Sequence, residues 1–265
     1  QNHLNKHKLE TLVPDLIANK GKSLVIAGNI LSKDVHIAVN LLNEMLGNTE
    51  MYDYASSSIT FCEERTVAEF DDLIGAMSSG KVGVLIHLDS NPAYHLPSDY
   101  GYSSAIKKVP TVVSLTESVN ESSALSNYIL PINHALESWG DFALRTGNYS
   151  LQQPIINPIH NSRQKEAILL NWMSDDVKTY AHDIYHKFLM NHWETAMYPM
   201  LGLSVSFKEF WYSFVHDGFV NALASTATAT PINSAALAGT KAISANGYTV
   251  MLINSMYVGD GRYAN

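Results

Sequence analysis

The chain has 265 residues, of which 46% are hydrophobic and 16% are charged, and its formal net charge is −8 at pH 7. This length suits one large α/β domain, and the negative charge argues against nucleic acid, which binds clustered Lys and Arg. The single cysteine, Cys62, excludes an internal disulfide and a cysteine-ligated cluster within this sequence, and no run of about 18 apolar residues predicts a membrane span.

The first third of the chain is predicted to alternate helices and buried strands. The expected elements are a helix over 5–18, a strand over 22–27, a helix over 33–46, a strand over 56–61 and a helix over 67–78. Ser32 and Thr66 are suitable N-caps, and Gly47 and Gly80 end the helices that they follow. This order predicts right-handed crossovers and a parallel sheet.

Three short apolar runs in the centre of the chain predict further parallel strands. They cover residues 82–88, 111–116 and 127–130, with helical stretches at 102–108 and before Ser126. The predicted fold is therefore α/β, a mostly parallel open sheet with helices on both faces, as in a Rossmann-like three-layer sandwich. Ligands of such sheets bind just past the carboxyl ends of the strands, so the loop Asp89–Tyr94 is the first candidate site.

The second half of the chain is predicted to be less regular. Residues 134–141 are expected to form a loop or short helix, residues 144–158 to be irregular, and helices to cover 163–172, 175–190 and 206–216. An Ala/Ser/Thr-rich loop over 223–245, a strand over 248–253 and a turn over 259–265 follow. We interpret residues 1–265 as a single domain and a fragment of a longer chain, with 159–245 as a helical and Ala/Ser/Thr-rich appendage.

Histidines at helical spacing form one candidate metal site. His182 and His186 lie four residues apart, and His192 follows. This spacing can ligate zinc, but position 183 is Asp where the zinc-protease helix has Glu, so the ligand shell is incomplete. A structural role is therefore favoured, and no metal site is predicted.

Other catalytic patterns are equally incomplete. Glu137 and Asp141 are paired carboxylates, for which bracing of a loop through backbone N–H groups is favoured over acid–base work. The acidic neighbours of Cys62 raise a thiol pKa and so oppose a nucleophilic role. The sequence has no Gly-x-Ser-x-Gly elbow and no Walker loop, and Gly28 lacks the further glycines of a dinucleotide fingerprint. No catalytic residue is predicted.

Residues 82–158 nevertheless resemble a known superfamily. The pattern is a strand followed by Asn91-Pro92-Ala93, then Lys107–Pro110, Glu121–Ala124, Tyr128–Pro131, Leu136-Glu137, Gly140 and Pro154. It resembles the molybdopterin oxidoreductase (DMSO reductase-like) superfamily. Residues 136–141, 216–220 and 259–265 are similar, more narrowly, to the large iron–sulfur subunit of bacterial alternative complex III, a quinol:cytochrome c oxidoreductase.

The resemblance implies an oxidoreductase complex of the respiratory chain. It implies iron–sulfur clusters elsewhere in the full-length chain, cytochrome c and quinol-binding membrane subunits as partners, and a peripheral position on the periplasmic side of the bacterial inner membrane. It also implies that the molybdopterin-like region has lost its cofactor. Asp89 and Ser90 stand where cofactor-binding relatives have glycines, which keeps the backbone away from a phosphate.

Three functions remain open at this point. The first, which we favour, is a non-catalytic scaffold without cofactor. The second is a fragment that binds a molybdopterin guanine dinucleotide, in which Asn91, Pro92 and Glu117 line the nucleotide pocket because they follow strand ends. The third is a nicotinamide or sugar-nucleotide domain, which would need a glycine fingerprint at Gly28.

Overall fold

The computed structural model describes most of the chain, and the chain divides into two compact units. The described residues are 6–52, 66–145, 147–174, 180–222, 233–239, 248, 250, 253, 255–259 and 261. The first unit comprises residues 1–57 and 226–265, and the second comprises residues 58–225. The assignment of a single domain with an appendage at 159–245 stays a prediction.

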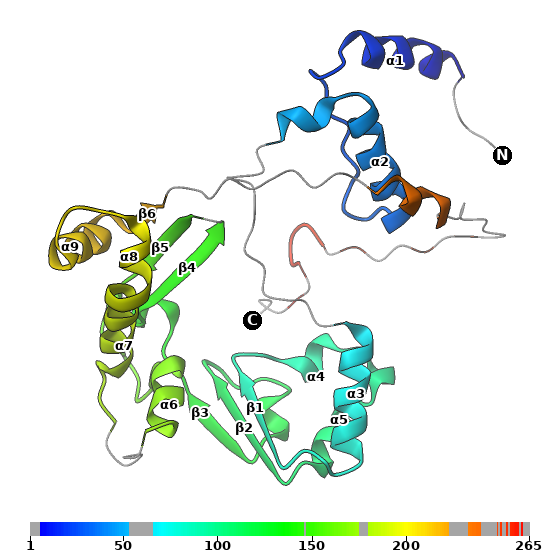
Figure 1. The fold of residues 1–265 in the computed structure, drawn as a ribbon. Helices are drawn as coiled ribbons and strands as arrows, with labels where there is room; N and C mark the ends of the chain where they lie inside the picture. Colours follow the sequence, from blue (N-terminus) through cyan, green and yellow to red (C-terminus); the bar gives the residue numbers. More distant parts are fainter. Residues whose placement is uncertain are drawn as a thin grey trace. The chain divides into compact units, whose positions relative to one another are not determined.

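A parallel sheet in the order β1-β2-β3 forms the centre of the second unit (Figure 1). Its strands are β1 (Val84–Leu88), β2 (Thr111–Thr116) and β3 (Tyr128–Pro131). In its register Ile86 is paired with Val113, and Val113 with Tyr128. The three apolar runs of the sequence are thus confirmed as parallel strands, with helical crossovers between them.

Helices cover both faces of this sheet. They are α3 (Val67–Ser78), α4 (Pro92–His95), α5 (Tyr102–Ala105) and α6 (Lys165–Trp172). Met77 of α3 is fully buried in a cluster with Val112 of β2. Leu115 lies three residues further along β2, so it points to the opposite face, where it contacts Ile168 of α6 and Ile132. The fold is therefore mixed α/β in three layers, as the sequence predicts.

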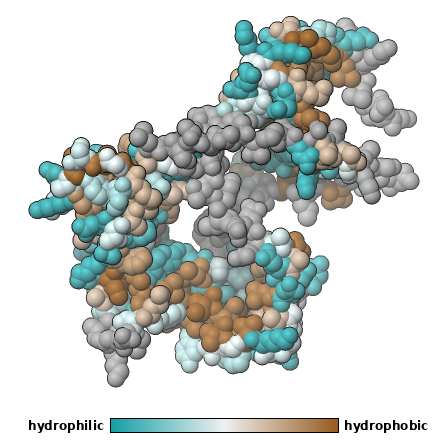
Figure 2. Space-filling model, viewed as in Figure 1, coloured by the Kyte–Doolittle hydropathy of each residue, from teal (hydrophilic) through white to brown (hydrophobic). Residues whose placement is uncertain are grey.

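One part of this sheet is not covered by any helix of the described part of the chain. Val84, Ile86 and Leu88 of β1 point to the same face as Leu115, and they are 57%, 42% and 43% exposed. Figure 2 shows apolar side chains gathered over the part of the molecule where Figure 1 places β1 and β2. We call these three side chains the β1 face.

A second, antiparallel sheet follows in the order β4-β5-β6. Its strands are β4 (Gly140–Arg145), β5 (Asn148–Gln152) and β6 (Phe219–Asn221). The prediction that residues 144–158 are irregular is therefore wrong for the hairpin. Gly147 adopts a positive φ of 77° that allows the tight turn, and Leu151 is buried against the aromatic helices while its neighbours are not.

Aromatic helices pack on this second sheet. They are α7 (Ile184–His192), a π-helical turn at Trp193–Met197, α8 (Tyr198–Leu201) and α9 (Phe207–Asp217). The fully buried Trp193 contacts Phe210 and Phe214 of α9 in the centre of this cluster. The predicted helix over 175–190 begins later than expected, because residues 180–183 are not helical and residues 175–179 lie outside the described part.

The described residues of the first unit form two long helices and an extended segment held by side chains. Its helices are α1 (Lys6–Ala18), α2 (Lys33–Met45) and two short 3-10 helices, η1 (Asn48–Met51) and η7 (Ser234–Gly239). Residues 22–27 do not form the predicted strand. The side chain of Asn43 on α2 replaces a strand partner, since its Oδ1 accepts from Val25 N at 3.0 Å and its Nδ2 donates to Val25 O at 2.8 Å.

Several predicted features fall on residues outside the described part. These are the strand over 56–61, Cys62, most of the segments 223–245 and 248–253, and most of the turn over 259–265. The remaining short helices are the 3-10 turns at Ser98–Tyr100, Ile106–Lys108, Ser123–Leu125 and Ala135–Glu137. No helix among the described residues is long and apolar enough to cross a membrane.

Candidate functional site

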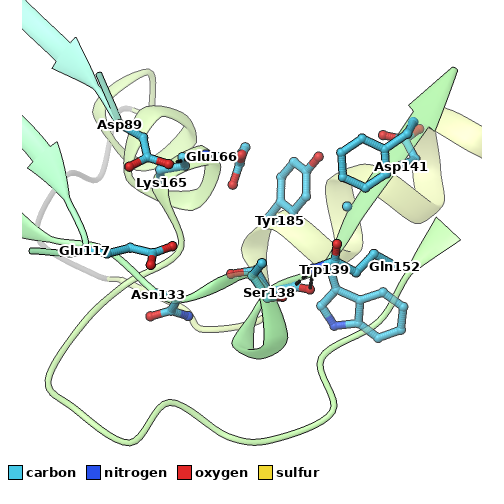
Figure 3. Close-up of a pocket in the computed structure, with 13 residues that line it drawn as sticks. Asp89, Glu117, Asn133, Ser138, Trp139, Asp141, Gln152, Lys165, Glu166 and Tyr185 are labelled. Carbon is cyan, nitrogen blue, oxygen red and sulfur yellow. Dashed lines mark hydrogen bonds and ion pairs between the residues drawn. The ribbon is translucent and has the colours of Figure 1, made fainter. Parts of the chain in front are cut away.

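A cavity of about 210 Å³ opens at the carboxyl ends of the parallel strands (Figure 3). Asp89 follows β1, Glu117 follows β2 and Asn133 follows β3, and all three line it. Trp139 and Tyr185 supply aromatic walls from the second half of the unit. The cavity therefore lies where open α/β sheets bind their ligands, as the sequence predicts from the position of the Asp89 loop.

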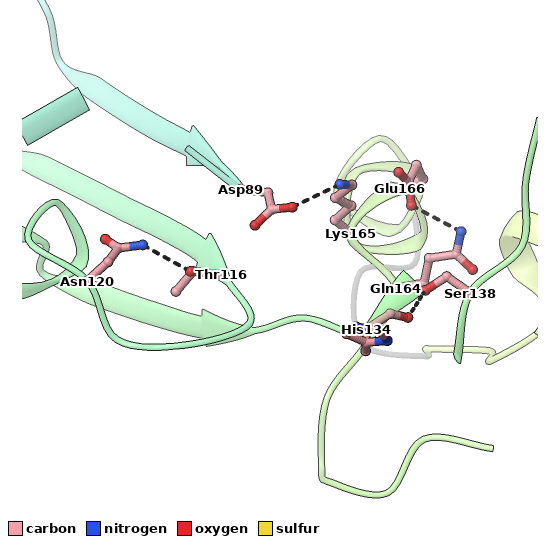
Figure 4. Close-up of polar contacts among 8 residues, drawn as sticks. All are labelled: Asp89, Thr116, Asn120, His134, Ser138, Gln164, Lys165 and Glu166. Atoms are coloured by element: carbon pink, nitrogen blue, oxygen red, sulfur yellow. Dashed lines mark hydrogen bonds and ion pairs between the residues drawn. The ribbon is translucent and has the colours of Figure 1, made fainter. Parts of the chain in front are cut away.

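The cavity is strongly acidic. Its lining includes the carboxylates of Asp89, Glu117, Asp141 and Glu166, and Lys165 is the single cation among the described residues that line it. The Nζ of Lys165 lies 3.3 Å from Oδ2 of Asp89, and both side chains are more than a third exposed (Figure 4). A pair this exposed contributes little stability, and the remaining charge of the lining is negative.

Backbone geometry sets the direction of the Asp89 side chain. Asp89 has a positive φ of 51°, the single described non-glycine residue of this kind. Its N–H donates to Leu115 O at 2.8 Å, which extends the pairing of β1 with β2 by one residue. Aspartate tolerates this left-handed conformation better than most residues, because its short side chain can bond locally.

Fixed hydrogen bonds hold the aromatic wall. Gln164 accepts from Trp139 N at 3.3 Å and donates to Trp139 O at 2.7 Å, while the same amide nitrogen donates to Glu166 Oε2 at 3.0 Å. Asp141 Oδ2 accepts from Nε1 of the buried Trp193 at 2.9 Å. These contacts tie the cavity wall to the cluster of aromatic helices.

Of the three residues predicted to line a nucleotide pocket, Glu117 alone borders the cavity. Asn91 instead braces the neighbouring loop: its Nδ2 donates to Glu121 Oε2 at 2.6 Å, and its Oδ1 accepts from Ser122 N and Oγ at 3.1 and 2.9 Å. The hydrogen bond from Asn91 is the main cause that lowers the pKa of Glu121. Pro92 is the first residue of α4, where its missing N–H costs nothing. Cofactor binding by these residues stays a prediction.

The paired carboxylates Glu137 and Asp141 both have structural partners. Glu137 accepts from the backbone N–H groups of Ile159 at 2.9 Å and His134 at 3.0 Å, and these bonds lower its pKa. The bracing role predicted for Glu137 is thus confirmed. Asp141 lines the cavity but also holds the indole of Trp193.

The three histidines of the candidate metal site have aromatic neighbours. His186 stacks on Trp139 with ring centroids 4.1 Å apart, and burial lowers its pKa. His182 packs edge-on against Tyr180, and His192 lies parallel to Phe188. Within the described part of the chain, no three His, Cys, Asp or Glu side chains come together as metal ligands.

Sequence reasoning missed the residues that complete the cavity from the second half of the unit. Lys165 and Glu166 lie on a helix that was expected, and Tyr185 lies on α7. Lys165 meets Asp89 across 76 residues of sequence, a pairing that no local pattern encodes. An acidic residue directly after two strands, Asp89 and Glu117, was the one available signal.

Comparison with known proteins adds a distant structural likeness. No protein-family model matches this sequence, and no curated protein matches it. Among solved structures, acetylene hydratase from Pelobacter acetylenicus is similar, with 13% sequence identity and a TM-score of 0.39. The likeness covers 57% of this chain and 20% of that chain, so this chain spans about a fifth of the length of that structure.

Proposed function

We propose that this chain is a non-catalytic scaffold region of a molybdopterin-oxidoreductase-like iron–sulfur subunit in a respiratory quinol:cytochrome c oxidoreductase of the alternative complex III type. Its clusters are carried elsewhere in the full-length chain. Its partners are the cytochrome c and quinol-binding membrane subunits, and it lies on the periplasmic side of the inner membrane. The resemblance of residues 82–158 and 259–265 motivates this assignment.

The acidity of the cavity is the observation that carries the scaffold role. A pterin guanine dinucleotide brings a pyrophosphate to the strand ends, and anions are stabilised there by backbone N–H groups and cations. Here the strand ends present Asp89 and Glu117, and Asp141 and Glu166 also line the cavity. Lys165, the one lysine among the described residues of the lining, is already paired with Asp89. Repulsion among like charges therefore disfavours the anionic cofactor.

One measurement on the full-length protein tests the proposal. The purified protein is analysed for molybdenum and tungsten by mass spectrometry and for pterin by oxidation to its fluorescent product. We expect iron but no stoichiometric pterin. A content of one pterin per chain would contradict the scaffold role.

The alternative is a fragment that binds a molybdopterin guanine dinucleotide, and the position of the cavity favours it. The cavity lies past the ends of three parallel strands, and Glu117 borders it. Titration with GDP, the nucleotide end of that cofactor, separates the two. The scaffold role predicts no binding by the natural chain and weak binding by an Asp89→Asn, Glu117→Gln double variant, because the variant removes two negative charges. Stoichiometric binding of GDP by the natural chain would contradict the scaffold role and support the alternative.

A further inference from the structure

A second hollow, of about 480 Å³, lies in the second unit beside α9. Its other walls are β6 and the segment that precedes α9. We call it the α9–β6 groove. Its apolar lining consists of Leu203, Val205, Phe210, Phe214, Phe219 and Val220. Phe210 and Phe214 belong to the buried aromatic cluster and form a fixed floor. The groove is thus a surface built on a buried aromatic cluster.

The rim of the groove exposes large apolar side chains. Leu203, Val205 and Phe219 are 47%, 50% and 56% exposed. All three side chains line the same hollow, and exposed apolar side chains gathered at one place mark sites of association. Burial of this area by a partner would be favourable, since each buried apolar side chain gains hydrophobic free energy.

The polar side of the groove is anionic. Glu209, Ser213 and Asp217 follow one another at four-residue intervals along α9, so they form a single row beside the apolar floor. Hydrogen bonds from Ser206 lower the pKa of Glu209, and hydrogen bonds from His216 and Ser213 lower the pKa of Asp217. Both carboxylates are therefore ionised at neutral pH, and the net charge of the whole chain, −8, has the same sign.

The backbone beside the groove suits an extended partner. β6 is the terminal strand of the antiparallel sheet in the described part of the chain, since it pairs with β5 alone. An extended segment places alternate side chains on one side, so two apolar side chains can enter one hollow while the residues between them face outward. The tight turn at Gly218, with a φ of 75°, keeps α9 and β6 close together as the two walls.

We propose that the α9–β6 groove binds a short extended segment of another protein, with apolar side chains at alternate positions and Lys or Arg beside them. The apolar side chains occupy the hollow over Phe210 and Phe214. The basic side chains lie along the row of Glu209 and Asp217. Hydrophobic burial supplies the affinity, and the charge of the row selects basic over acidic segments.

A peptide selection tests this inference. The chain is immobilised and a phage-displayed library of random peptides of about nine residues, long enough for one strand and its flanks, is selected against it. We expect enriched peptides with alternating apolar residues and at least one Lys or Arg. The strongest peptide is then synthesised and its affinity measured by calorimetry, together with a copy in which Glu replaces each basic residue.

Matched variants locate the binding surface. Phe219→Asp and Val205→Asp place a charge at the rim and are expected to weaken binding at least about tenfold, as interface anchors do. Tyr212→Asp is the control, because Tyr212 is 64% exposed on the same helix but does not line the groove. A Glu209→Gln, Asp217→Asn double variant is expected to bind the basic peptide several-fold more weakly and to lose most of the salt dependence.

Four results of the binding experiments would overturn the inference. They are the absence of any enriched peptide, equal affinity for the acidic copy, equal loss of binding in the Tyr212→Asp control, and binding that survives both rim substitutions. Light scattering tests a second copy of this chain as the occupant. If the natural chain forms a dimer and the Phe219→Asp variant is a monomer, the groove is assigned to a second copy instead. Because the probes are peptides and carry no pterin or nucleotide, failure here is separate from failure of the scaffold role.

Discussion

The side chain of His87 joins β1 to β2 and α5 inside the second unit, and its removal is the strongest single test of the packing. His87 is 3% exposed. Its Nδ1 lies 2.8 Å from Ser114 Oγ, and its Nε2 lies 2.5 Å from the hydroxyl of Tyr102, which is itself buried. Ser114 Oγ has a further partner in Ser126 Oγ at 2.8 Å. A His87→Ala substitution therefore removes the hydrogen-bond partner of the Tyr102 hydroxyl, whereas Ser114 Oγ keeps Ser126 Oγ as a partner.

The expected cost follows from these contacts. Two hydrogen bonds contribute about 1–3 kcal/mol together, and a buried hydroxyl left without a partner adds about 1–3 kcal/mol. The lost imidazole also leaves a cavity between β1 and α5. We therefore expect His87→Ala to lower the free energy of unfolding by about 4 kcal/mol.

Urea unfolding followed by tryptophan fluorescence measures this effect. All four tryptophans, at 139, 172, 193 and 211, lie in the second unit, so the signal reports on the unit that contains His87. His160→Ala is the control, because His160 is exposed and its loss is expected to change stability by less than about 0.5 kcal/mol. A His87→Ala variant within about 1 kcal/mol of the natural chain would refute the reasoning from hydrogen-bond loss.

Three further predictions concern pH, a side-chain clamp and a helix cap. Burial lowers the pKa values of His87 and His186 below 6.5, so the folded chain binds fewer protons than the unfolded chain just below that pH. The contribution of these histidines to the free energy of unfolding is therefore complete above pH 6.5 and is lost as the pH drops towards the lowered values. Urea unfolding measured across this pH range must show a weaker loss in a His87→Gln variant. Asn43→Ala removes both hydrogen bonds to Val25 and is expected to lower the stability of this segment by about 2 kcal/mol. Hydrogen exchange at the Val25 amide should then be faster, and unchanged exchange would disprove the role of Asn43. Ser206→Ala removes the cap of α9 and is expected to cost about 1 kcal/mol in thermal unfolding, whereas Ser206→Thr, which keeps the hydroxyl, must not.

Local patterns were sufficient for the parallel sheet and for most helices. Short apolar runs gave β1, β2 and β3, because strands buried in parallel sheets need little alternation. Thr66 and Ser206 accept from the backbone three residues later and form capping boxes, and a cap at Thr66 was expected from sequence. These features depend on residues within one turn or one strand of each other.

The features that were missed depend on distant residues. The hairpin of β4 and β5 has a weak alternation, and its third strand, β6, is supplied by residues 219–221. Residues 22–27 have the composition of a strand, but the amide of Asn43 pairs with Val25 in place of another strand. Local sequence predicts only part of the site. Asp89 and Glu117 directly follow apolar runs, whereas Lys165 reaches Asp89 only through the tertiary fold.

The β1 face also determines how the isolated chain behaves in concentrated solution. Val84, Ile86 and Leu88 present a half-exposed apolar surface on a strand, a surface that favours colloidal self-association. The net charge of −8 opposes this association by mutual repulsion, which salt screens over about 10 Å at 0.1 M. We therefore expect the second virial coefficient from light scattering to fall as salt is added. In an Ile86→Lys variant the second virial coefficient should stay positive as salt is added. Ionic strength therefore controls the solubility of the natural chain.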